Sequence, residues 1–229
     1  MHGHGHGSPL AALDTPKGAG AVAPVYRALF HFNNSDADEC GVYGWSAKSQ
    51  VGSYATSPAK LGSHSLKGAF NWTLDADPLA DRNTVACGVA AFVRCGLAGA
   101  ANKQKLHSTY GDSTHYSDLD VYFYNATTLR FRIANRTDLS ESDTLVYDHP
   151  VASSVNTWFW VAIVIRGTDI DCYVDGVKVT TLSLTGTTAW DQSSAAPVIN
   201  GNLTLSYLDE LAYFKGAVPP AVPATEIVP

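Results

Sequence analysis

The acidic side chains of this sequence are its first candidates for chemistry, because carboxylate oxygens are the ligands that calcium prefers in proteins. They form two clusters, one at Asp36, Asp38 and Glu39 and the other at Asp209 and Glu210. If the fold brings both clusters together, they could share one calcium ion. The alternative is a solvated acidic loop and a separate, hydrogen-bonded pair of carboxyl groups.

Aromatic side chains in or beside predicted loops are the second set of candidates, because a flat ring can stack on a sugar while polar neighbours bind its hydroxyl groups. The alternative for each ring is a place in the core, since Trp and Tyr are highly buried on average. Tyr110 belongs to this set, and the residues predicted to bind carbohydrate are Tyr43, Trp45, Trp72, Tyr116 and Trp190.

A catalytic set is harder to find. Glycoside hydrolases use two carboxyl groups flanking the scissile bond, and the nearest arrangement is Glu141-Ser142-Asp143, after which Thr144-Leu145-Val146 supplies no general acid. The sequence also lacks the nucleophile elbow, the zinc-protease motif and a phosphate-binding glycine loop. We therefore predict a protein that is not an enzyme, with a divergent polysaccharide hydrolase or lyase as the alternative.

Charge and hydropathy narrow the range of partners. The 229 residues carry 15 Lys and Arg against 21 Asp and Glu, a net charge of −6 with no basic run, which argues against nucleic acid. No apolar run approaches the ~20 residues that span a bilayer, so no membrane insertion is expected. The N-terminus lacks the cationic and apolar regions of a signal peptide, so we expect the chain to act where it is made or to leave by another route, such as a particle released by lysis.

The cysteines and N-terminal histidines could also bind metals or form bonds. None of Cys40, Cys87, Cys95 and Cys172 has the spacing of a zinc or redox pair, so buried free thiols are expected rather than a disulfide framework. The alternating His2, His4 and His6 are predicted to be a tag or an arm. The alternative is a ring of imidazoles from several subunits around a transition metal.

The elements that must position these residues are strands. Residues 158–165, 170–174 and 177–184 form a predicted antiparallel meander, in which Asp175-Gly176 is a type I′ hairpin signal. Further strands are predicted over 26–32, 84–94, 119–124, 129–133, 197–199 and 203–213, with residues 96–117 as the longest loop. No segment has the apolar period of a helix, so the fold class is all-β, a two-sheet antiparallel sandwich. Asp118 and Asp120 are expected to pair with Arg130 or Arg132 across a hairpin.

The predicted domain covers residues 26–217. Residues 1–25 form a Gly-, Ala- and His-rich arm, and the Pro-rich residues 218–229 form a second arm. The strand at 158–165 is apolar on both faces, whereas a sandwich strand needs only one apolar face. Its outer face is therefore expected to be covered by a terminal arm, a loop or a neighbouring subunit, and the last is excluded if Trp160, Phe159 and Ile163 are buried within one subunit.

Four segments carry a resemblance to a known family: ALFHFNNSD at 28–36, KLGSHSLKGAF at 60–70, the pair WFWVA at 158–162 and YVDG at 173–176, and YLDELAYFKGA at 207–217. In type and order they resemble the laminin-G-like jelly roll of the concanavalin A-like lectin/glucanase superfamily. Trp160 departs from the family's usual His and Asn33 from its common Asp. The resemblance implies two curved sheets stacked face to face, with the last strand beside the first, which would bring the two acidic clusters together.

The resemblance also implies a function, because members of that family are mostly carbohydrate-binding modules, adhesion domains, and appendage or decoration domains of bacteriophage particles. We therefore predict a non-catalytic structural or adhesive module on a virion, with virion proteins or copies of itself as partners and surface glycans as ligands. It would be found in the virion, or outside the cell after release. The alternative is a calcium-dependent, lectin-type carbohydrate-binding domain.

Overall fold

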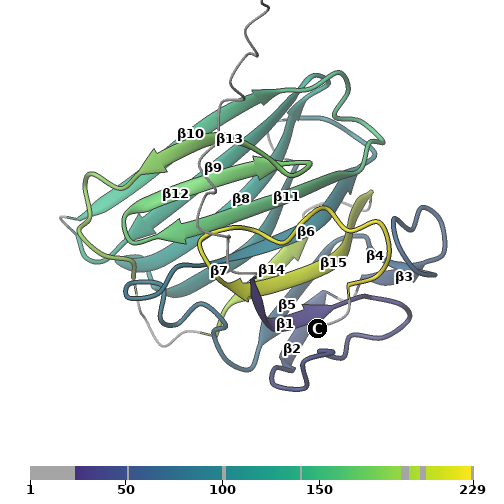
Figure 1. The fold of residues 1–229 in the computed structure, drawn as a ribbon, viewed down its shortest axis with the longest axis horizontal. Coiled ribbons are helices and arrows are strands. Elements are labelled where there is room, and N and C mark those ends of the chain that lie inside the picture. The colour runs from purple at the N-terminus through teal and green to yellow at the C-terminus, as the bar shows by residue number, and fades with distance from the viewer. Residues whose placement is uncertain are drawn as a thin grey trace, which may run out of the picture.

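Alternating apolar and polar residues build two antiparallel sheets that stack face to face (Figure 1). The computed structural model describes residues 24–50, 52–99, 102–139, 141–191, 196–201 and 205–227. Sheet A has the strand order β13 (Val177–Ser183), β12 (Asp169–Val174), β11 (Phe159–Arg166), β6 (Cys87–Cys95), β15 (Ser206–Lys215), β4 (Ser65–Lys67) and β3 (Ser53–Ala55), and β1 (Val25–Phe30) also pairs with β15.

Sheet B has the strand order β10 (Ser142–Pro150), β9 (Thr128–Arg136), β8 (His115–Asn125), β7 (Lys103–Asp112), β14 (Val198–Gly201), β5 (Phe70–Leu74) and β2 (Trp45–Gln50). The all-β, two-sheet prediction is confirmed. No helix long and apolar enough to cross a membrane occurs in the ranges that the structure describes.

The predicted meander is β11, β12 and β13. Asp175 and Gly176 both have positive φ, 49° and 79°, as a type I′ turn requires. The Asp175 carboxylate also accepts a hydrogen bond from the Trp160 backbone N–H at 2.9 Å, which ties the turn to β11. The local chemistry of the turn therefore sets the register of this hairpin.

The outer face of sheet A is covered by the chain itself. An outer cluster lies on this face, made of Leu29, Ala90, Phe92, Trp160, Ala162, Val164, Ala212, Phe214 and Ile227. Trp160 and Ile163 are 0% exposed and Phe159 is 5% exposed within one subunit. The prediction that a neighbouring subunit covers this face is therefore wrong. The prediction that a terminal arm covers it is confirmed, because Ile227 belongs to the outer cluster. The C-terminal segment, residues 218–227, crosses this face in yellow in Figure 1.

The C-terminal segment is therefore an arm that folds back on its own domain. The Ile227 side chain joins the outer cluster, and its backbone N–H donates to Glu210 at 3.2 Å. The predicted N-terminal arm and the alternating His2, His4 and His6 lie outside the described residues. All four cysteines are free thiols; Cys87, Cys95 and Cys172 are buried as expected, whereas Cys40 is half-buried.

The loop predicted over residues 96–117 is wrong, because these residues contain β7 and the start of β8. Besides Leu106, the buried side chains of β7 include the polar residues Gln104, His107 and Thr109. An inner face of this kind hides the apolar alternation by which a strand is recognised.

Candidate functional site

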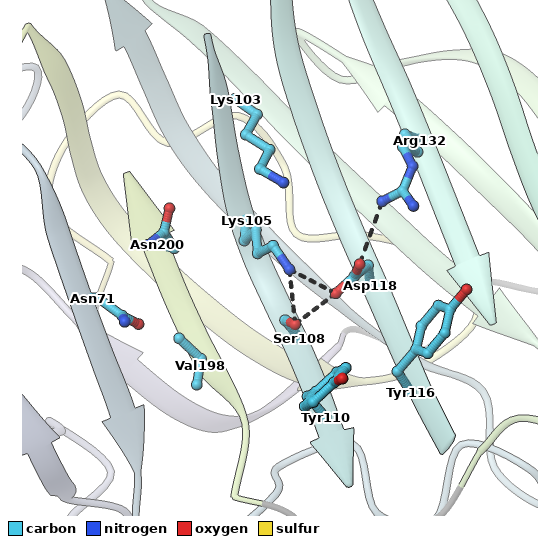
Figure 2. Close-up of a pocket in the computed structure, with 10 residues that line it drawn as sticks. All are labelled: Asn71, Lys103, Lys105, Ser108, Tyr110, Tyr116, Asp118, Arg132, Val198 and Asn200. Atoms are coloured by element: carbon cyan, nitrogen blue, oxygen red, sulfur yellow. Dashed lines mark hydrogen bonds and ion pairs between the residues drawn. The ribbon is translucent and has the colours of Figure 1, made fainter. Parts of the chain in front are cut away.

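The outer face of sheet B, unlike that of sheet A, is open and carries a hollow of about 550 Å³ (Figure 2). We call it the sheet B hollow. Five neighbouring strands contribute its lining, which is polar except for Val198: Asn71 from β5, Val198 and Asn200 from β14, Lys103, Lys105, Ser108 and Tyr110 from β7, Tyr116 and Asp118 from β8, and Arg132 from β9.

The register of the sheet explains the hollow. Val198 pairs with Ser108, Ser108 with Asp118 and Asp118 with Ala134, so a row of short side chains runs across the sheet. Longer side chains stand on both sides of this row, with tyrosines at one end and cations at the other. Side chains two residues apart on a strand point to the same face of a pleated sheet. The short side chains therefore form the floor of the hollow, and the longer side chains on either side of them form its walls.

A β-bulge in β7 allows one strand to supply both walls. The pairing of β7 with β8 shifts between Lys105 and His107, and both Leu106 and His107 point inward and are buried. The extra residue changes which side chains face outward. Lys103 and Lys105 therefore line the hollow before the bulge, and Ser108 and Tyr110 line it after the bulge.

Asp118 organises the polar part of the hollow. Its carboxylate accepts hydrogen bonds from Ser108 Oγ at 2.5 Å, Lys105 Nζ at 2.9 Å and Arg132 Nη1 at 3.3 Å. Burial alone would raise the pKa of Asp118, but the positive charges and these hydrogen bonds outweigh it and hold the pKa below its ordinary value. Asp118 is therefore ionised, and it fixes two cations in place.

Asp120, two residues further along β8, pairs in register with Lys105 and Arg132 of the lining and is 0% exposed. Arg132 Nη1 donates to it at 2.9 Å, so the predicted pairing across the hairpin is confirmed for Arg132, whereas Arg130 pairs with Asp148 at 2.6 Å. Burial and the neighbouring Asp118 charge raise the pKa of Asp120 to about 6. Its proton occupancy therefore changes close to neutral pH.

Tyr110 and Tyr116 form the aromatic wall. Their ring centroids are 6.5 Å apart with an interplanar angle of 24°, and Tyr110 is 62% exposed. An exposed ring offers an apolar face to a ligand, while Asn71 and Asn200 each supply amide donors and an acceptor. This combination suits a ligand that has both apolar faces and many hydroxyl groups.

Of the aromatic residues predicted to bind carbohydrate, only Tyr116 lines the sheet B hollow. Trp72 and Trp190 are 1% and 2% exposed, with their indole N–H groups bonded to the Gln50 and Gly167 carbonyls, so neither can stack on a sugar as predicted. The half-buried Trp45 packs against Phe30 and Trp72, and the half-buried Tyr43 packs against the core. Burial therefore overturns the prediction for Trp72 and Trp190, whereas Tyr43 and Trp45 are half-buried and lie outside the sheet B hollow.

The first acidic cluster is used to hold loops in place. Asp38 is buried, and its two oxygens accept hydrogen bonds from the backbone N–H groups of Leu29, Cys40, Val42 and Tyr43. Asp36 forms an ion pair with Lys48. The exposed Glu39 lies beside a smaller hollow of about 330 Å³ near His31.

The second cluster is also engaged with protein groups. Asp209 accepts hydrogen bonds from the backbone N–H groups of Lys60, Leu61 and Glu210, and burial raises its pKa to about 7. Glu210 lies 2.8 Å from His31, and this hydrogen bond raises the pKa of His31. No three His, Cys, Asp or Glu side chains in the described ranges are placed to hold a metal ion. The shared calcium ion stays a prediction from the sequence.

The carboxyl groups of Glu141 and Asp143, the nearest match to a catalytic motif, also have structural roles. The Asp143 carboxylate accepts hydrogen bonds from the backbone N–H groups of Thr185, Gly186 and Thr187, which anchors that loop to β10. Glu141 Oε2 accepts a hydrogen bond from the Thr137 hydroxyl. Neither carboxyl group lines the sheet B hollow.

Several lining residues were not anticipated from the sequence, namely Asn71, Lys103, Lys105, Ser108, Val198 and Asn200. The outward alternation of Lys103 and Lys105 is visible in the sequence, but it is lost at the bulge. Asn71 and Asn200 meet only through the pairing of β5 with β14, which are far apart in the chain.

The two stacked antiparallel sheets define the class of this protein as a two-sheet β-sandwich. A profile of the laminin G type, described as the concanavalin A-like lectin/glucanases superfamily, matches residues 71–220. The chain belongs to this family. No curated protein matches the chain in sequence.

Solved structures share the fold. The binding domain of botulinum neurotoxin DC, in complex with SialylT, has a TM-score of 0.59 at 11% identity, over 86% of this chain and 49% of that one. The botulinum neurotoxin serotype D binding domain has a TM-score of 0.60 at 12% identity, over 85% and 48%. This chain therefore spans about half the length of those toxin domains.

Domain 4 of AbnA, a GH43 extracellular arabinanase from Geobacillus stearothermophilus, was solved in complex with arabinotriose. It has a TM-score of 0.59 at 17% identity, over 87% of this chain and 96% of that domain. At such identities the likeness shows the fold alone.

Proposed function

We propose that the chain is a saccharide-binding module and that its ligand occupies the sheet B hollow. The observation that carries this proposal is the exposed Tyr110 ring beside the polar lining residues Asn71, Asn200 and Asp118. A sugar presents apolar C–H faces and hydroxyl groups together, so a site that recognises it needs a ring and paired donors and acceptors. The arabinotriose complex of the AbnA domain, which has the same fold, supports the proposal by analogy.

The fixed geometry of the hollow also favours binding. Lys105, Ser108 and Arg132 are held by Asp118 before any ligand arrives. Side chains that are already ordered lose little conformational entropy on binding. The hollow can therefore bind a flexible saccharide without first rearranging its own walls.

A glycan array with the purified chain tests the proposal, followed by affinity measurements on the best ligand. We expect Tyr110→Ala to weaken binding about tenfold, because an aromatic contact contributes both buried area and specific geometry. Val177→Ala is the control, since Val177 has a similar exposure of 66% but lies on β13 of sheet A. Binding to no glycan, or equal losses in both variants, would contradict the proposal.

Saccharide binding is compatible with the predicted role on a virion, which stays a prediction from the sequence. A decoration or appendage protein that binds surface glycans would need an attachment to the particle as well as the sheet B hollow. Light scattering for oligomers and co-sedimentation with particles test that role. A monomer that sediments with no particle would count against it and would leave saccharide binding unaffected.

A further inference from the structure

The sheet B hollow is lined mainly by positive charges, although the chain as a whole is negatively charged. The chain has a net charge of −6, yet three cations and one carboxylate line this hollow, namely Lys103, Lys105, Arg132 and Asp118. Figure 2 shows the nitrogen atoms of the three cations in one half of the hollow, opposite Tyr110 and Tyr116. Like charges gathered in this way repel one another unless an anion lies among them.

Asp118 and Asp120 satisfy only two of the three cations. Lys105 pairs with Asp118, and Arg132 pairs with both carboxyl groups. Lys103 pairs with no carboxylate in the part of the chain that the structure describes, and its Nζ lies 5.9 Å from the centroid of the Tyr122 ring. Its ammonium group is therefore oriented by an aromatic ring and remains available to an anion.

Lys105 and Arg132 can also bind a ligand while they stay paired. A lysine ammonium has three N–H donors and a guanidinium has five. Lys105 uses two of these in its contacts with Ser108 and Asp118. Lys105 and Arg132 therefore keep N–H donors for a charged oxygen beside Lys103, and these donors are already fixed in position.

The separation between the two ends sets the length of the ligand. Lys103 and Tyr110 lie seven positions apart on one bulged strand, which corresponds to roughly 20 Å at about 3.3 Å per residue. One sugar ring cannot reach both ends, whereas an oligosaccharide can.

We propose that the sheet B hollow binds acidic oligosaccharides, with an oxyanion of the sugar bound by Lys103, Lys105 and Arg132 and a sugar ring packed on Tyr110. This inference rests on the proposed function and adds the chemical class of the ligand. The shared chemistry is a saccharide that bears an oxyanion, either the carboxylate of a uronic acid or a sulfate ester. Charge-assisted hydrogen bonds to such a group are about twice as strong as neutral ones.

The experiment compares acidic saccharides with neutral counterparts of the same backbone. Oligogalacturonate is measured against its methyl ester, and chondroitin sulfate against a desulfated form and a desulfated, carboxyl-reduced form. We expect at least one acidic form to bind about tenfold more tightly than its neutral counterpart, a difference of about 1.4 kcal/mol. This preference should shrink as salt screens the charges. The desulfated arm distinguishes a sulfate from a carboxylate.

Lys103→Met should abolish most of that preference, because it should weaken binding of the acidic form more than binding of the neutral form. Lys67→Met is a matched control, because Lys67 also lies over a tyrosine ring, 5.7 Å from the centroid of Tyr207, but on sheet A. Equal affinity for acidic and neutral forms, or equal losses in both variants, would overturn the inference and leave saccharide binding standing. If no saccharide binds in any form, the proposed function itself is wrong.

Discussion

The outer faces of the two sheets have the same pleated geometry, but the face of sheet A is covered and the face of sheet B is open. On sheet A, Ala90 pairs with Ala162 on one side and Ala212 on the other, so a low strip of small residues runs between the large rings of Trp160 and Phe214. The C-terminal segment lies over this face and buries it. On sheet B the corresponding face is polar, keeps its charges fixed around Asp118 and stays open.

The difference teaches how this sandwich separates stability from recognition. Covering the apolar face of sheet A with the chain's own C-terminal segment removes apolar area from water. On sheet B the side chains are already hydrogen-bonded to one another, so leaving the face open costs little. The closed face should therefore determine stability, and the open face should determine binding.

The largest expected effect is on the closed face. Trp160→Ala removes a large side chain that is 0% exposed and should lower the free energy of unfolding by about 3–5 kcal/mol. Urea denaturation measures this change. Tyr110→Ala on the open face is the control and should change stability by less than about 0.5 kcal/mol. Similar losses in the two variants would erase the distinction between the faces.

The next effect tests whether the C-terminal segment is part of the closed face. Ile227→Ala removes a side chain that is 8% exposed and should cost about 2 kcal/mol, at the lower end for such substitutions because a chain end can relax. Val222→Ala, at 40% exposure, serves as the control. If Ile227→Ala leaves the denaturation midpoint where it is, the segment does not cover sheet A in solution.

A smaller effect is expected on the open face when the pH changes. With a pKa of about 6, Asp120 carries a negative charge above pH 6 and is largely neutral below it. Lys103, Lys105, Arg132 and Asp118 are the other charged groups around it. Affinity for an acidic saccharide should therefore rise about threefold from pH 7.5 to pH 5, while the ligand carboxylate stays ionised. Calorimetric titration at several pH values measures this rise.

Asp120→Asn is the matched variant for that titration, because it keeps the shape of the side chain and removes the charge. It should bind the acidic saccharide with the same affinity at both pH values. If the affinity of the wild-type chain falls toward low pH, or if Asp120→Asn shows the same rise in affinity as the wild-type chain, Asp120 does not control the affinity of the hollow.

The smallest effect concerns calcium. The carboxylates of Asp38 and Asp209 already accept backbone N–H groups, so removing divalent cations with a chelator should shift the Tm by less than about 1 °C. Differential scanning calorimetry with and without chelator measures this shift. A fall of several degrees that added calcium reverses would support the predicted calcium site.

Much of the fold could be predicted because its signals are local. The Asp-Gly turn, the strands of the meander and the double-sided apolar pattern of β11 are all visible within residues 158–184. The need to cover β11 followed from that pattern alone. Which segment covers it did not follow, because Ile227 joins the cluster around Trp160 only through tertiary packing.

The sheet B hollow was mostly invisible in the sequence for physical reasons. Most buried side chains of β7 are polar and the bulge at Leu106 and His107 breaks its period, so the strand resembled a loop. The rings of Trp72 and Trp190 looked available but are buried. The aromatic candidates Tyr110 and Tyr116 do line the hollow. The pairing of Asp118 and Asp120 with Arg132 could also be predicted, because a single hairpin brings these residues together.

The central claim is that the open face of sheet B, and not the closed face of sheet A, binds saccharide. Backbone amide NMR of the labelled chain, titrated with the best ligand from the glycan array, tests it most directly. We expect the shifts to concentrate on β5, β7, β8, β9 and β14 around Tyr110, Asn200 and Lys103, with β11 to β13 unchanged. Shifts concentrated on the C-terminal segment and around His31 would contradict the account.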